Sequence, residues 1–151
     1  MRNVPENGLS PREAADLCCI ASIMIPADEA LGVPGADDPV IFADINASLG
    51  RDLGNVREAL AALAVLGGGA FSALPPARQE AVAEAFLARA DAATATLGRV
   101  VLQCYYRDDR VMQSLGLEPR PPFPKGHKLE QGDLSLLDPV RARPQLWRNA
   151  P

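Results

Sequence analysis

The sequence predicts an all-α protein: a small helical bundle of about five to six helices, followed by a long, extended, proline-rich C-terminal tail. Only 5% of residues are aromatic although 48% are hydrophobic, because alanine supplies much of the apolar content, and alanine is the best helix former. Apolar residues also recur at helical spacing along the first two-thirds of the chain. Half of the 14 prolines follow residue 117, which excludes a long helix there. We therefore divide the chain into a helical domain, residues 1–117, and a tail, residues 118–151.

The first helix is expected to begin after Ser10 and to end before Pro26. The Ser10 hydroxyl suits the N-cap, Pro11 suits the first helical position, and Glu13 stands where a capping box needs an acid. Proline at 26 disfavours helical backbone in the residue before it. The apolar stripe of this helix consists of Leu17, Ile20, Ala21 and Met24.

A loop rich in turn residues, 26–39, separates the first two helices. Asp38 and Pro39 start the second helix as cap and first residue, and a third helix runs from about residue 55 to 66. Gly67–Gly69 is not followed by Gly-Lys-Ser/Thr, so we interpret it as a helix end or hinge rather than a phosphate-binding loop. The expected inward residues are Val40, Ile41, Ile45 and Leu49 in the second helix, and Val56, Leu60, Leu63 and Ala64 in the third.

Three further helices complete the expected bundle. Pro76 begins the fourth after a turn anchored by Phe71 and Leu74, the fifth spans about 92–106, and the sixth spans 108–115. Gly116 suits the left-handed position that closes a helix. The expected inward residues are Val82, Phe86 and Leu87 in the fourth helix, and Leu97, Val100, Val101, Cys104 and Tyr105 in the fifth.

Most kinds of catalytic and metal site lack the residues they need in this chain. There is one histidine, and the three cysteines (Cys18, Cys19 and Cys104) form no Cys-x-x-Cys pair, which excludes common zinc, iron–sulfur and covalent haem sites. No dinucleotide fingerprint follows a strand. We therefore expect no catalytic, cofactor-binding or metal-binding residue on this chain.

The net charge and the N-terminal residues indicate which partners and which cellular compartment to expect. The net charge of −4 argues against nucleic-acid binding, which needs clustered Lys and Arg. The N-terminal residues include neither an apolar signal core nor twin arginines, and no uninterrupted apolar run approaches the ~18 residues of a membrane span. We expect a cytoplasmic protein without membrane insertion.

Two groups of neighbouring residues, one charged and one aromatic, can each be interpreted in two ways. Asp108 and Asp109, beside Arg107 and Arg110, provide two acids suited to proton transfer, but a capped helix start with solvated salt bridges is the favoured interpretation. The pair Tyr105–Tyr106 is either a binding edge or a core residue beside a hydrogen-bonded rim, and the sequence does not choose between them.

The tail combines prolines with apolar anchors, which ordinary disordered linkers lack. It has six Lys and Arg against four acidic residues, whereas the helical domain has nine against fifteen. An extended chain of this length reaches on the order of 100 Å, more than the diameter of its own domain. The tail is therefore expected to lie on a surface, part of which belongs to a partner. Its anchors are Phe123, Leu134, Leu136, Leu137, Val140, Leu146 and Trp147.

Several short motifs together resemble a known family. They are Ile-Met-Ile-Pro (23–26), Pro-Gly-Ala-Asp (34–37), Tyr-Tyr-x-Asp-x-Arg-Val-x-x-x-Leu-Gly (105–116) and Leu-Asp-Pro-Val-Arg-x-Arg (137–143). With this order of helices and a proline-rich tail, the chain is similar to the gluconate 2-dehydrogenase subunit 3 family. Its members are small subunits of flavin-dependent sugar and alcohol dehydrogenases.

The resemblance implies a partner and places the cofactor on it. The partner would be a large FAD-binding subunit of the glucose–methanol–choline oxidoreductase type, and in some members of the family a cytochrome accepts the electrons. No cofactor is expected on this chain. Some small subunits carry the large one through twin-arginine export, but this sequence lacks that motif, so a cytoplasmic complex acting on sugars, glycosides or other alcohols is expected.

The residues and the resemblance favour a non-catalytic, stabilising subunit. Two rival classes remain: a self-contained helical binding or scaffold module without a flavoprotein partner, and a stand-alone enzyme using Asp108, Asp109 and the tyrosines. The expected partner interface consists of Tyr105, Tyr106, Arg110, Phe123, Pro124, Leu137, Val140, Arg141, Leu146 and Trp147.

Overall fold

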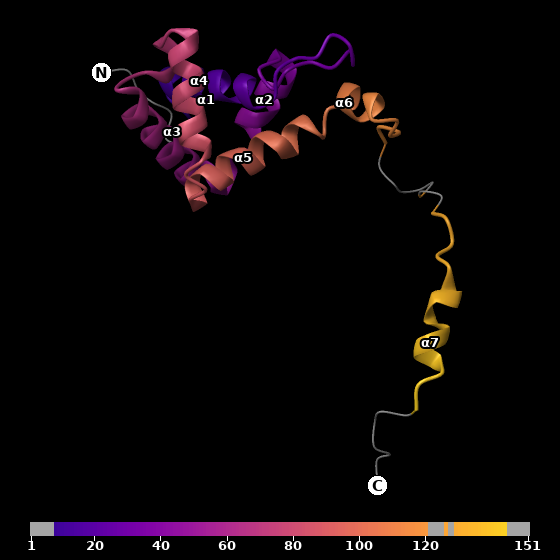
Figure 1. The fold of residues 1–151 in the computed structure, drawn as a ribbon. Coiled ribbons are helices and arrows are strands. Elements are labelled where there is room, and N and C mark those ends of the chain that lie inside the picture. Colours follow the sequence, from indigo (N-terminus) through magenta and orange to yellow (C-terminus); the bar gives the residue numbers. More distant parts are fainter. Residues whose placement is uncertain (1–7, 121–125, 127–128, 145–151) are drawn as a thin grey trace. The chain divides into compact units, whose positions relative to one another are not determined.

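The computed structural model describes residues 8–120, 126 and 129–144. All the secondary-structure elements named within these residues are α-helices or 3-10 helices. The chain divides into two compact units, Met1–Pro119 and Arg120–Pro151, which we describe separately. The first unit holds six α-helices and two short 3-10 helices among its described residues (Figure 1). The all-α fold expected from composition and periodicity is therefore confirmed.

Helix α1 (Pro11–Met24) begins with the full capping box. The Glu13 amide donates to Ser10 Oγ at 3.3 Å, and the Ser10 amide donates to Glu13 Oε2 at 2.7 Å. Two amides that have no partner within the helix are satisfied in this way. The buried stripe is Leu17, Ile20 and Ala21, with Met24 packed at its edge.

Helix α2 (Pro39–Ser48) begins at the Asp38 cap, whose carboxylate accepts from the amides of Val40 and Ile41. After η1 (Gly50–Asp52), α3 (Leu53–Gly67) ends at Gly68, which has a left-handed φ of 73°. The glycine run is thus the helix end expected from the sequence. Val40 was expected in the core but is exposed, because each helix position is turned by about 100° from the next, which takes Val40 off the face that buries Ile41 and Ile45.

Three more helices follow η2 (Phe71–Ala73): α4 (Pro76–Leu87), α5 (Ala92–Tyr105) and α6 (Asp109–Ser114). Phe71 is fully buried and Gly116 has a φ of 73°, as expected for an anchor and a helix terminator. Leu87, predicted to point inward, is 41% exposed because Phe86 beside it takes the core position at the end of α4.

Helix α3 is the centre of the first unit. It packs against α1, α4 and α5, while α2 packs against α5 and η2 packs against α1 (Figure 1). One continuous core of aliphatic side chains, Phe71 and Phe86 joins these elements. The core needs few aromatic residues because alanines such as Ala59 and Ala83 let the helices approach closely.

Among the described residues, one segment, Gly50–Ala73, is long and apolar enough to cross a membrane by length and composition alone. It comprises η1, α3 and η2, and the core helix of a soluble protein passes the same test. Within this segment Val56, Leu60, Leu63 and Phe71 are buried in the protein core.

The second unit contains a helical segment that the sequence did not predict. A 3-10 helix, η3 (Leu134–Leu137), runs directly into α7 (Asp138–Arg141), and we call residues 134–141 the tail helix. Asp133 caps it by accepting from the amide and hydroxyl of Ser135 at 3.0 and 2.6 Å. Pro139 fits because it lies in the first turn of α7, where its missing N–H costs nothing.

Candidate functional site

The junction between α5 and α6 is built around Arg110, which joins two helix caps. Its Nη2 and Nη1 donate to Asp38 Oδ1 and Oδ2 at 2.8 and 3.1 Å. Its Nε and Nη2 donate to Asp108 Oδ1 and Oδ2, both at 3.0 Å. Asp38 caps α2 and Asp108 caps α6, so one guanidinium fixes the starts of both helices relative to each other.

These contacts explain the electrostatics of the junction. Hydrogen bonds from Arg110 hold the pKa of Asp38 at about 2, well below its ordinary 3.8, and the capped amides of Val40 and Ile41 add to the effect. The pKa of Asp108 is lowered in the same way, first by Arg110. A carboxylate held ionised in this way is a poor proton donor or acceptor near neutral pH. Asp108 is therefore placed as the cap of α6, as the favoured interpretation expected, and not as one of two acids for proton transfer.

A second arginine ties the end of α5 to α2. Arg107 Nε and Nη2 donate to Asp44 Oδ2 at 3.0 and 2.6 Å, and Nη2 also donates to Ser48 Oγ at 2.8 Å. Cys104 Sγ lies 3.6 Å from the same nitrogen. Arg107 and Arg110 therefore attach the α5–α6 junction to opposite ends of α2.

The two tyrosines divide between core and surface. Tyr105 is buried, whereas Tyr106 is more than half exposed, and their rings meet edge to face with centroids 5.2 Å apart. Only Tyr106 therefore offers a ring to a partner. Arg110 is also partly exposed, but both of its carboxylate partners lie within the first unit.

The tail residues of the expected interface fall into two groups. Leu137, Val140 and Arg141 lie in the tail helix, where all three are exposed. Arg141 Nη1 donates to Asp138 Oδ1 at 3.1 Å along the same face. The remaining expected contacts, Phe123, Pro124, Leu146 and Trp147, lie outside the described residues.

The apolar side chains of the tail helix are exposed in the part of the second unit that the structure describes, residues 120, 126 and 129–144. Leu134, Leu136, Leu137 and Val140 are between 45% and 75% exposed, although three- and four-residue spacings place such side chains next to one another. The tail helix thus presents a capped apolar surface, and none of the described residues of the second unit is buried.

The described residues assemble no metal site and no activated nucleophile. No group of three or more His, Cys, Asp or Glu in this part of the chain is placed to hold a metal ion. Burial raises the pKa of all three thiols, and the nearby carboxylates Asp37 and Asp16 add to the effect at Cys18 and Cys19, respectively. Raised values keep a thiol protonated and unreactive at neutral pH.

The Pro-Gly-Ala-Asp motif has a structural role in the loop before α2. A Cβ at Gly35 would lie 2.4 Å from Asp37 Oδ1 and 3.0 Å from the Ala27 nitrogen, so only glycine fits without movement. The next residue, Ala36, is fully buried, and its amide donates to the Ile25 carbonyl at 2.9 Å. The motif therefore locks the 26–38 loop onto the end of α1.

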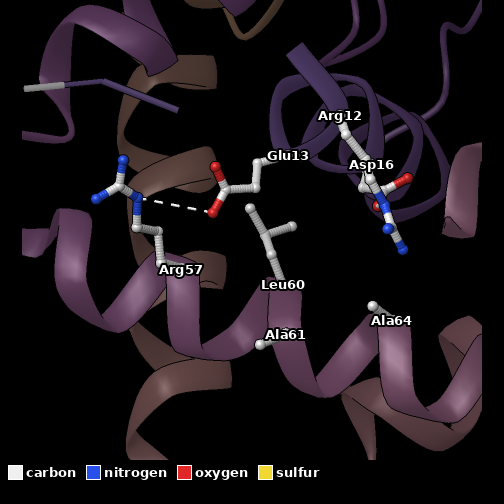
Figure 2. A pocket seen from close by; sticks show the side chains of 7 residues that line it. All are labelled: Arg12, Glu13, Asp16, Arg57, Leu60, Ala61 and Ala64. Atoms are coloured by element: carbon white, nitrogen blue, oxygen red, sulfur yellow. Dashed lines mark ion pairs between the residues drawn. The ribbon is translucent and has the colours of Figure 1, made fainter. Parts of the chain in front are cut away.

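Sequence reasoning did not identify a pocket of about 310 Å³ between α1 and α3. Arg12, Glu13 and Asp16 line it from α1, and Figure 2 shows these opposite the α3 residues. From α3 it is lined by Arg57, Leu60, Ala61 and Ala64. The available signal was Asp16 itself, a charged residue placed directly before Leu17 on the apolar stripe of α1.

Asp16 is the buried charge of this pocket, with only 3% of its surface exposed. Its Oδ1 accepts from the Ser72 amide at 2.8 Å and from the Ser72 hydroxyl at 2.7 Å, which joins α1 to η2. The nearest cation to Oδ2 is Arg12, whose Nε is 3.9 Å away, too far for a hydrogen bond. At the other end of the pocket, Arg57 Nε lies 3.6 Å from Glu13 Oε1 (Figure 2).

Comparison with known proteins identifies no family for this chain. No family model matches it. No curated protein and no solved structure matches it either.

Proposed function

We propose that this chain is the non-catalytic, stabilising subunit of an FAD-dependent oxidoreductase of the glucose–methanol–choline type, acting on sugars, glycosides or other alcohols. The large subunit would bind FAD and substrate, and this chain would bind the large subunit. In this proposal the complex is cytoplasmic, and its electrons pass to an acceptor such as a cytochrome or a soluble oxidant.

The observation that carries the proposal is the tail helix. Four apolar side chains of this capped helical segment are exposed among the residues that the structure describes. Fully burying one leucine or valine side chain contributes ~1.5–3 kcal/mol. An amphipathic helix that lays such residues into an apolar groove is a recurrent way of binding a protein.

The contacts in the rest of the described chain support a structural role rather than a catalytic one. Its ion pairs cap helices and join α2 to the α5–α6 junction. The motifs behind the family resemblance have similar structural roles, since Gly35 and Ala36 close a loop and Asp108, Arg110 and Gly116 build α6. The flavoprotein identity of the partner rests on that resemblance.

The test begins by looking for a large flavoprotein encoded beside this chain and co-expressing the two, followed by affinity purification. We expect a complex with one bound flavin per large subunit and alcohol- or sugar-dependent reduction of an artificial electron acceptor. Replacing Leu134, Leu136 and Leu137 with Ser should release the large subunit. The matched control is Leu31→Ser, which changes a leucine within the same range of exposure, in the loop of the first unit.

Each outcome of this experiment bears on a different part of the proposal. If the wild-type chain captures no flavoprotein, the oxidoreductase assignment is wrong. If the triple variant captures the large subunit as well as wild type does, the tail helix is not the interface. Flavin or turnover in the purified chain alone would favour the stand-alone enzyme.

A further inference from the structure

We propose that the pocket between α1 and α3 receives an aliphatic ammonium or guanidinium group, supplied by a Lys or Arg side chain of the partner protein. That the partner is a large flavoprotein subunit rests on the function proposed above, whereas the chemistry of the pocket does not. The pocket would be a second contact, on the helical domain rather than on the tail.

Asp16 is incompletely hydrogen-bonded by the residues around it. Its Oδ1 has two donors from Ser72, but Oδ2 has no hydrogen bond within the described residues. Oδ2 is not among the fully enclosed polar atoms that lack a partner, so it keeps contact with solvent, and a donor that replaces this solvent would form a charge-assisted hydrogen bond. Because Oδ2 faces Arg12, which also lines the pocket, a donor that enters the pocket can reach this oxygen.

Arg12, the cation nearest to Asp16, is only loosely paired with it. The side chain of Arg12 is 58% exposed, and its Nε stays 3.9 Å from Oδ2. Arg12 can therefore swing into solvent without losing a hydrogen bond to Asp16. Arg57, the other cation of the pocket, is already paired with Glu13 and also donates from Nη2 to the Gly8 carbonyl.

The lining of the pocket is apolar on one side and acidic on the other. Leu60, Ala61 and Ala64 form an aliphatic surface along α3, next to the carboxylates of α1 (Figure 2). Lys and Arg side chains match this arrangement, because their methylene stems cover apolar surface while the charged end stays hydrogen-bonded. The helical domain is also strongly acidic, with fifteen acidic residues against nine basic ones, which favours a basic partner.

The pocket is tested on the full-length chain alone, by NMR titration with n-butylammonium chloride against uncharged n-butanol at equal ionic strength. Saturable shifts are expected at α1 and α3 with a Kd on the order of millimolar, as suits a ligand of so few atoms. Asp16→Asn should weaken binding at least about 10-fold, because one charge-assisted hydrogen bond is lost. Glu84→Gln, which changes an exposed carboxylate of α4, is the matched control.

A second variant, Arg12→Ala, tests the site even if Asp16→Asn fails to fold. Arg12→Ala removes the competing cation and should bind n-butylammonium about two- to fivefold more tightly. Equal binding of n-butanol, or an unchanged affinity in Arg12→Ala, would overturn the proposed site. These results hold whether or not the partner is a flavoprotein.

The source of the cation is tested by co-purification of Asp16→Asn, with its tail intact, with the large subunit. Reduced recovery at moderate salt would support a partner side chain in the pocket. If n-butylammonium binds as expected but recovery of the large subunit is unchanged, the pocket takes a free amine, and the partner assignment is overturned.

Discussion

Arg110 holds Asp38 across 72 positions of sequence, with its two terminal nitrogens 2.8 and 3.1 Å from the two carboxylate oxygens. The same guanidinium also holds Asp108, so a single side chain joins the N-caps of α2 and α6. Helix α6 has only six residues and buries one side chain deeply, that of Val111. The position of α6 therefore depends on this ion-pair network more than on apolar packing.

Arg110→Ala should loosen α6 while leaving the other helices of the first unit folded. We expect a loss of about 0.5–1.5 kcal/mol in the free energy of unfolding, modest because the guanidinium is partly exposed to solvent. Amide hydrogen exchange should accelerate in Asp109–Ser114 far more than in α3. Arg78→Ala, an exposed arginine of α4, is the control and should change neither quantity. Unchanged exchange in α6 would show that Val111 suffices to hold it.

Stability at low pH should depend on Asp38. Its pKa is about 2 in the folded chain and 3.8 ordinarily. The folded state therefore favours the ionised form, and the stabilisation is complete above about pH 4 and is lost as the pH falls through 2. In urea titrations at pH 2 to 6, the difference in unfolding free energy between wild type and Asp38→Asn should shrink towards the acidic end. A difference that is equally large at pH 2 and at pH 6 would show that the charge of Asp38 does not contribute to stability.

Two glycine substitutions should have opposite effects on stability. Gly35→Ala places a Cβ against Asp37 and the backbone of Ala27, so we expect a loss of about 1–2 kcal/mol. Gly54→Ala lies near the start of α3 with open space around the new methyl group and should stabilise the chain by about 0.5–1 kcal/mol. Thermal or urea unfolding measures both. Equal effects would mean that the 26–38 loop adjusts freely.

The three thiols should react slowly in the folded chain. Burial raises the pKa of Cys18, Cys19 and Cys104, which lowers the thiolate fraction at neutral pH. Reaction with a disulfide reagent at pH 7.5 should be slower than for glutathione and should become fast in urea. A single rapidly reacting thiol in the folded chain would instead indicate a redox-active cysteine.

Removing residues 120–151 should sharply weaken partner binding but preserve the first unit. The compact unit ends at Pro119, and its core and helix caps lie within residues 8–119. The truncated chain should unfold cooperatively, within about 1 kcal/mol of the full-length chain, because exposed tail side chains contribute little to stability. Circular dichroism measures the first result and co-purification the second. A truncated chain that unfolds early would show that the tail stabilises its own domain.

Much of the α5–α6 junction was predictable from local sequence, but its partners were not. The Asp108 cap and the terminating Gly116 follow short-range rules, and both were expected. The contribution of Asp38 was not, because a pattern of neighbouring residues says nothing about a carboxylate 72 positions away. The pocket was missed for the same reason, since it exists only where α1 crosses α3.

The sequence by itself determined the helices of the first unit, since their boundaries depend on signals a few residues apart. Ser10, Asp38, Pro76 and Gly68 each start or end a helix through backbone geometry or a local hydrogen bond. Tertiary structure decided which side of each helix is buried, as the exposed Val40 and Leu87 show, and which charges meet. Asp16 is buried because α1 packs on η2, and Ser72 then lies within hydrogen-bonding distance. Burial and long-range pairing depend on how the helices pack, and no short segment of the sequence specifies that.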